Sequence, residues 1–313
     1  DALWQRGEHS KLWRWLERLP AGVVASRPHL GVFRAWNLCA TGQPDAAEQS
    51  LHAAEQVLGM AGGLEPGTGS SQPDAPLGAE RKRLVGRIAM TRATLAFFRG
   101  DVPEIIHHTR QALAYLPEQD TAWRSMAAVA LGDAHRIQGD MEATYHARLE
   151  ALEISKAAGN VYMVLVASMK QAVTLRQCGQ LAQVLEICEQ QVQLARESGL
   201  SQTAVAGGFL AIWGEVLAET GDLDGALQRS KAGLALAERG EEMVVLGWSY
   251  LCRMRALLTA GDLSSAQALI RRVENRTRKA GIPPWIRKMI AAWQARLWLA
   301  QGRPEAAAQW MAE

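Results

Sequence analysis

The sequence predicts an all-α protein, a solenoid of helix–turn–helix repeats that are each about 40 residues long. Three observations predict it. Glycines recur at steps of 58, 39, 40, 42, 40 and 41 residues, at Gly42, Gly100, Gly139, Gly179, Gly221, Gly261 and Gly302. Helical patterns of apolar residues lie between them, and no segment has the clear apolar–polar alternation of a strand. A fixed period of this size is typical of stacked repeats, which expose an extended concave groove.

Each glycine is expected to form the turn within one repeat. Glycine readily adopts the positive φ that ends a helix, and an aspartate just after it can cap the next helix. The phrases IQGDMEAT and ETGDLDGA show this Gly-Asp pair. We therefore predict a first helix over residues 123–138, followed after Gly139-Asp140 by a second helix that starts at residue 141.

Two columns of residues keep the same distance from the glycines. Seven residues before each glycine the side chain is almost always Ala or Gly, at Ala35, Ala93, Gly132, Ala172, Gly214, Met254 and Ala295. Five residues after it stand the small or β-branched residues Ala47, Ile105, Thr144, Val184, Ala226, Ala266 and Ala307. Helices approach closely only where side chains are small, so we expect these columns to pack the two helices of each repeat together.

The chain is expected to form a single domain over residues 1–313, interrupted by a flexible Gly/Pro-rich insertion at residues 59–78. The insertion accounts for the one long step between glycines. A phosphate-binding loop is the alternative for this segment, but no GK[ST] follows it and no strand precedes it. Because the chain lacks an initiator Met and stops within a repeat, we expect it to be a fragment of a larger protein.

Composition and motifs argue against several classes of function. The 34 Lys+Arg residues nearly balance the 32 Asp+Glu residues, so charge gives no case for direct nucleic-acid binding. The sequence contains no apolar run of membrane-spanning length and no secretion signal. It also lacks the common nucleophile, zinc and nucleotide motifs. We expect a cytoplasmic, non-enzymatic domain without a cofactor or metal. A disulfide or metal role for Cys178 with Cys188 stays open.

Tryptophan is unusually frequent, with 11 residues against 4 Tyr and 4 Phe. The tryptophans gather near the ends of the chain, at Trp4, Trp13, Trp15, Trp285, Trp293, Trp298 and Trp310. Two interpretations stay open: they close the ends of the hydrophobic core, or they dock neighbouring domains.

Charged and aromatic residues also recur on the face of the first helices that helix pairing does not require. They stand 13, 6 or 3 residues before the turn glycines, which are positions on one side of a helix. Trp and Arg with Asp and Glu suit a polar small molecule through stacking and bidentate hydrogen bonds, and they suit a peptide equally. The candidate ligand-binding residues are Trp36, Arg87, Asp133, Arg136, Arg176, Glu215, Trp248, Arg255 and Arg296.

The opening stretch, from WLERLP to the AE that follows Gly42, resembles the tetratricopeptide-like superhelical domain of MalT-type, LuxR-family ATP-dependent transcriptional regulators. The shared features are the Leu-Pro ending, Arg27-Pro28-His29-Leu30, the Ala35-Trp36 pair and the glycine turn. ETGDLDGAL and TAGDLSSAQALI look like repeat turns of the same family. The resemblance covers essentially the whole chain and implies a right-handed α-solenoid. The insertion at residues 59–78 departs from the family pattern.

The resemblance also implies a function. In such regulators an NTPase module of the STAND class and a helix-turn-helix module flank this region, and both are absent from this fragment. The domain would bind a small-molecule inducer or a regulatory protein, contact the other domains of its regulator and control activation. Self-association is left open. The alternative is a protein-interaction scaffold that binds a peptide or protein and has no small-molecule ligand.

Overall fold

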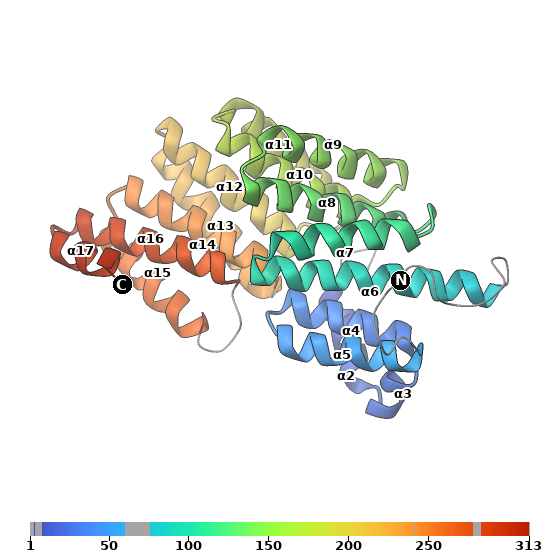
Figure 1. Cartoon of the computed structure of the whole chain (residues 1–313). Helices are drawn as coiled ribbons and strands as arrows, with labels where there is room; N and C mark the ends of the chain where they lie inside the picture. Colours follow the sequence, from blue (N-terminus) through green and yellow to red (C-terminus); the bar gives the residue numbers. More distant parts are fainter. Residues whose placement is uncertain (1–2, 4–7, 60–75, 241, 278–282, 313) are drawn as a thin grey trace. The chain divides into compact units, whose positions relative to one another are not determined.

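The computed structural model describes residue 3 and residues 8–59, 76–240, 242–277 and 283–312. Throughout these residues the regular structure is helical and contains no strand (Figure 1), which confirms the predicted helical-repeat class. The chain divides into two compact units, residues 1–170 and 171–313, and the boundary falls inside α10 (Val161–Gln177). No helix in the described part of the chain has both the length and the apolar character needed to cross a bilayer.

The first unit consists of successive helical hairpins that follow two shorter helices. The first helices α4, α6 and α8 contact one another in chain order, and each packs against its own second helix. The elements are α2 (His9–Arg18), α3 (Ala21–Ala25), α4 (Pro28–Ala40), α5 (Pro44–Val57), α6 (Pro76–Arg99), α7 (Val102–Tyr115), α8 (Thr121–Gln138) and α9 (Met141–Ala157), then the start of α10.

The second unit repeats this arrangement. The first helices α12, α14 and α16 contact one another in order, and α13, α15 and α17 pack against them. After the end of α10 come α11 (Leu181–Glu197), α12 (Ala204–Thr220), α13 (Leu223–Gly240), α14 (Met243–Thr259), α15 (Leu263–Thr277), α16 (Pro284–Ala300) and α17 (Pro304–Ala312).

All seven turn glycines have positive φ, between 71° and 94°, as predicted. In each turn the N–H of the next residue donates to the carbonyl five residues back, as Asp140 does to His135 at 3.0 Å, which closes the end of the first helix. The aspartates after four of the glycines then cap the second helices, since Asp101, Asp140, Asp222 and Asp262 each accept a backbone N–H three residues ahead.

The two columns pack as predicted. Every residue of both columns is buried. Space is tightest at two glycines: a Cβ on Gly214 would lie 2.6 Å from the backbone nitrogen of Ser230, and a Cβ on Gly132 would lie 2.7 Å from a guanidinium nitrogen of Arg148. The missing side chains therefore set how closely α12 approaches α13, and α8 approaches Arg148 on α9.

Most of the predicted insertion lies outside the described residues. Leu58 ends α5 as its C-cap and Gly59 follows it. Residues 60–75 are outside the description, and α6 begins at Pro76, so the last three residues of the expected loop belong to a helix.

Candidate functional site

Arg87, predicted from its place on α6, lies between three hairpins of the first unit. Its Nε donates to Asp120, the N-cap residue of α8, at 2.8 Å. Its guanidinium lies 5.7 Å from the ring centre of Phe33 and 5.4 Å from that of Trp123. Both members of the ion pair are buried, so Arg87 joins neighbouring hairpins. Trp36, also predicted, is buried on α4.

Asp133 is the focus of a second group in this unit, which we call the Asp133 centre and define as Asp133, Arg136, Arg148 and Lys170. Asp133 uses both carboxylate oxygens: Oδ1 accepts from Arg148 Nη2 at 2.6 Å, and Oδ2 accepts from Lys170 Nζ at 2.8 Å. Arg148 also donates from Nη1 to the carbonyl of Val129 at 2.6 Å. The centre thus joins the hairpin α8–α9 to α10.

The charges of the Asp133 centre act strongly on one another. Burial alone would raise the pKa of Asp133, but Lys170, Arg148 and Arg136 together lower it below its usual range. Burial lowers the pKa of Lys170, and the positive charges of Arg148 and Arg136 lower it further, whereas the carboxylate of Asp133 raises it. Burial also lowers the pKa of Arg136, with Arg148 adding to the effect. The charged form of Asp133 is therefore strongly favoured, while burial and mutual repulsion disfavour the charged forms of Lys170 and Arg136.

Glu215 organises the corresponding group in the second unit, the Glu215 centre, defined as Glu215, Arg176, Glu219, Cys252 and Arg255. Glu215 Oε1 lies 3.1 Å from Arg176 and 2.7 Å from Arg255. Arg255 also pairs with Glu219 at 2.6 Å. The thiol of Cys252 donates to Glu215 Oε2 at 3.1 Å, and burial together with this carboxylate raises the pKa of the thiol.

Aromatic rings extend the second group toward the end of the chain. Trp293 on α16 has Arg255 at 5.2 Å and Arg296 at 4.5 Å from its ring centre, which are cation–π distances. Trp248 is buried on α14, with its ring centre 5.8 Å from that of Trp285.

The structure thus brings together two subsets of the nine predicted residues. Asp133 and Arg136 stand three residues apart on α8, and Glu215 lies with Arg176 and Arg255, with Arg296 linked through Trp293. Trp36, Arg87 and Trp248 lie elsewhere in the packing. That any of these residues contacts a ligand stays a prediction.

Four members of the two centres are not among the nine predicted residues: Arg148, Lys170, Glu219 and Cys252. The repeat period could have indicated two of them, because Lys170 follows Asp133 by 37 residues and Cys252 follows Glu215 by the same 37. Arg148 was signalled more weakly, by a glycine on the helix that faces it.

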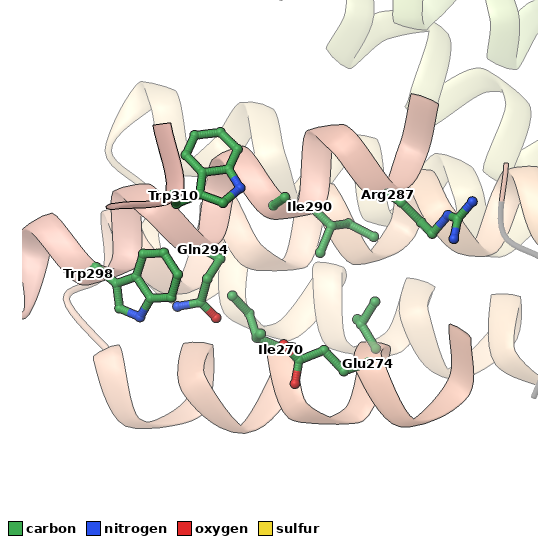
Figure 2. Close-up of a pocket in the computed structure, with 9 residues that line it drawn as sticks. Ile270, Glu274, Arg287, Ile290, Gln294, Trp298 and Trp310 are labelled. Atoms are coloured by element: carbon green, nitrogen blue, oxygen red, sulfur yellow. The ribbon is translucent and has the colours of Figure 1, made fainter. Parts of the chain in front are cut away.

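A pocket of about 290 Å³ lies among α15, α16 and α17 (Figure 2). Its wall is mostly apolar, with Trp298 and Trp310 at one end and Glu274 and Arg287 at the other. By its shape and lining alone, the pocket does not indicate a ligand.

The tryptophans near the ends of the chain do not all close the hydrophobic core, and they do not all form an exposed docking surface. Trp285, Trp293, Trp298 and Trp310 are half-buried and so contribute to packing, but Trp15 is 60% exposed, and Trp4 lies outside the described residues.

The cysteines answer the disulfide question. Cys39, Cys178, Cys188 and Cys252 are all free thiols, and only Cys178 among them is exposed. Among the described residues no group of His, Cys, Asp and Glu side chains could hold a metal ion.

Comparison with known proteins agrees with the repeat fold. The family model described as MalT-like TPR region matches residues 86–313. The chain resembles a Rap protein solved in complex with Competence and Sporulation Factor, with 14% identity, a TM-score of 0.62 and coverage of 91% of this chain and 74% of that one. It also resembles aspartyl phosphate phosphatase F from Bacillus subtilis, with 10% identity, a TM-score of 0.58 and coverage of 91% and 69%. At these identities the likeness concerns the fold alone. None of the curated proteins matches the chain.

Proposed function

Because the chain belongs to the family of MalT-like TPR regions, we propose that it is the inducer-sensing and protein-interaction domain of a LuxR/MalT-type transcriptional regulator. On this proposal a small-molecule inducer or a regulatory protein binds the face formed by the first helices and controls activation. ATP and DNA binding belong to other domains of the regulator. This domain carries out no catalytic step and uses no cofactor.

The observation that carries the proposal is the convergence of charged side chains from successive repeats. Asp133 on α8 is bonded to Lys170 on α10, and Glu215 on α12 is bonded to Arg255 on α14. A ligand that replaces one side chain in such a bond alters how two neighbouring hairpins pack against each other. Such a ligand shifts a conformational equilibrium if it binds one arrangement more tightly than the other.

A protein-interaction scaffold without a small-molecule ligand is the second candidate. It is favoured by the likeness to a helical-repeat protein that was solved in complex with a factor. It is also favoured by the charged face itself, which suits a peptide as well as a metabolite.

A thermal-shift screen of the purified chain against metabolites and sugars separates the two candidates. A ligand of the native state raises the melting temperature with its concentration. We expect a saturable increase for at least one compound if the domain senses an inducer. A flat screen, together with pull-down of a protein that binds the purified chain directly, would favour the scaffold.

Arg136→Ala and Arg176→Ala, singly and combined, test whether the first-helix face makes the contact. Both residues are half-buried, so the variants remove charge without opening a fully buried space. We expect weaker binding of the compound or partner found above, with the helical circular dichroism of the wild type. Arg110→Ala, an exposed arginine on α7, is the control. Unchanged affinity in the double variant would exclude these arginines as contacts.

A further inference from the structure

We propose that Arg296 on α16 is the docking point for an acidic side chain of a protein partner, and that the partner presents this side chain on an extended peptide segment. The inference rests on the proposed function and names the chemistry of the partner that the function leaves open. The side chain of Arg296 is exposed, so a partner can reach it from solvent.

The repeat register places Arg296 one step beyond an arginine that is ion-paired. Glu215, Arg255 and Arg296 each stand six residues before a turn glycine, on the successive first helices α12, α14 and α16. Arg255 pairs with two acids on the preceding first helix, Glu215 at 2.7 Å and Glu219 at 2.6 Å. The equivalent positions on α14, the helix that precedes Arg296, hold Arg255 and Thr259 instead. The two acids that pair with one arginine therefore have no counterpart for the next.

The last two first helices contain cations and no acid. Every charged residue of α14 and α16 is basic, namely Arg253, Arg255, Arg287, Lys288 and Arg296. Those of α14 have acceptors within the unit, since Arg253 donates to the carbonyl of Leu227 and Arg255 pairs with the two glutamates. Within the described residues, Arg296 makes a contact with an aromatic ring and no ion pair or hydrogen bond. A carboxylate from a partner is the charge complement of this surface.

The ring of Trp293 orients the guanidinium of Arg296. Trp293 stands about one turn earlier on α16, and the guanidinium carbon lies 4.5 Å from its ring centre. The same ring has Arg255 at 5.2 Å, so it links the ion-paired arginine to the exposed one. A guanidinium that lies over an indole keeps its in-plane N–H donors for a bidentate carboxylate, and the contact reduces the freedom that is lost when the bond forms.

A peptide segment fits this surface better than a free carboxylate does. One exposed ion pair contributes little by itself, because solvent screens both charges. Met289 and Trp293 precede Arg296 at helical spacing on one side of α16, and both are half-buried. Their exposed parts offer apolar contact to the residues that flank the acid in a peptide, which a small carboxylate does not have. The expected partner therefore carries an Asp or Glu next to an apolar side chain.

The test begins with a phage-displayed library of random short peptides, which is panned against the full chain at neutral pH. We expect the recovered peptides to be enriched in Asp or Glu beside an apolar residue. A fluorescein-labelled synthetic copy of the strongest binder then gives the dissociation constant by fluorescence anisotropy. Recovered peptides without enrichment of acids, or no recovered peptide at all, would overturn the proposal.

Arg296→Gln removes the charge from an exposed position, so we expect the variant to fold. The dissociation constant for the acidic peptide should rise about tenfold, the loss of one charged, bidentate contact. Arg296→Lys keeps the charge without the planar fork and should bind with intermediate affinity. Arg271→Gln removes an exposed arginine from α15, a second helix of the same unit, and should leave the affinity unchanged.

Arg296→Glu supplies the decisive measurement. A peptide with Lys in place of its acid should bind Arg296→Glu more tightly than it binds the wild type, and the original peptide should show the reverse preference. A purely structural role for Arg296 would not produce this exchange. Acidic peptides that bind equally to the wild type and to every Arg296 variant would overturn this inference and leave the proposed function standing. A flat inducer screen together with no bound peptide would remove the proposed function as well.

Discussion

The Asp133 and Glu215 centres are built on one template but carry different charged side chains. In both, an acid six residues before a turn glycine is bonded by the side chain 37 residues later. That residue is Lys170 in the first unit and Cys252 in the second. The residue nine positions after the glycine is Arg148 in one hairpin and Ser230 in the other, and each lies against a glycine of the first helix.

The difference teaches how a repeat protein varies its chemistry. The helices, turns and caps are alike in the two hairpins, so the electrostatic character of each centre depends on the side chains at a few equivalent positions. Arg148 and Lys170 of the Asp133 centre stand where the second unit has Ser230 and Cys252, and the Glu215 centre takes its charges from Arg176, Glu219 and Arg255 instead. The charged chemistry of a hairpin is therefore specified independently of its fold.

The largest expected effect comes from removing the two acids. Asp133→Asn removes the buried negative charge that Arg148 and Lys170 both contact, and we expect the free energy of unfolding to fall by about 3–5 kcal/mol. Glu215→Gln should cost less, about 1–3 kcal/mol, because Arg255 keeps Glu219 as a partner at 2.6 Å. Urea denaturation measures both, and hydrogen exchange in α8–α9 and α12–α13 locates the loss. Equal losses would show that the charge balance does not distinguish the centres.

The next effect concerns the two glycines that face the second helices. Gly214→Ala places a Cβ against the backbone of Ser230, which cannot move freely, and we expect a loss of about 2–3 kcal/mol. Gly132→Ala meets only the guanidinium of Arg148, so its cost should be smaller, about 1–2 kcal/mol. Adding Arg148→Met to Gly132→Ala should recover part of that loss. No recovery in this double-mutant cycle would mean that the two positions do not compete for space.

Acid titration gives a further contrast. The pKa of Asp133 is lowered from the ordinary 3.8, so its stabilisation is complete above that value and is lost as the pH falls toward the folded-state pKa. Between about pH 4 and pH 3, the wild type should lose on the order of 1 kcal/mol more than Asp133→Asn does. Urea denaturation across this range measures both slopes. Parallel curves for the two proteins would contradict the strong coupling at this centre.

The smallest effect is a control for the whole comparison. Asp140→Ala and Asp222→Ala each remove an N-cap hydrogen bond of about 3 Å at equivalent turns. We expect each to cost about 1 kcal/mol, and the two to agree. Chemical denaturation of the pair checks this. A large disagreement would mean that the hairpins differ in more than their charged centres.

The parts that could be predicted from sequence are those that repeat. Gly139 and Gly221 are visible because each sits at the same place in its period, and the helix-facing columns follow from the same count. The partners Lys170 and Arg148 escaped because they lie on other helices, and their distance from Asp133 depends on how successive helices pack. Gly159 and Gly199 also have positive φ, but they follow second helices, in the links between repeats, so the period of the turn glycines does not include them.

Arg148 lies deep in its hairpin because the residue opposite, Gly132, has no side chain. The two positions share one space, so any side chain added at position 132 competes with the Arg148 guanidinium. Related repeats should therefore lose the two together or keep glycine with a small partner, as Gly214 does with Ser230.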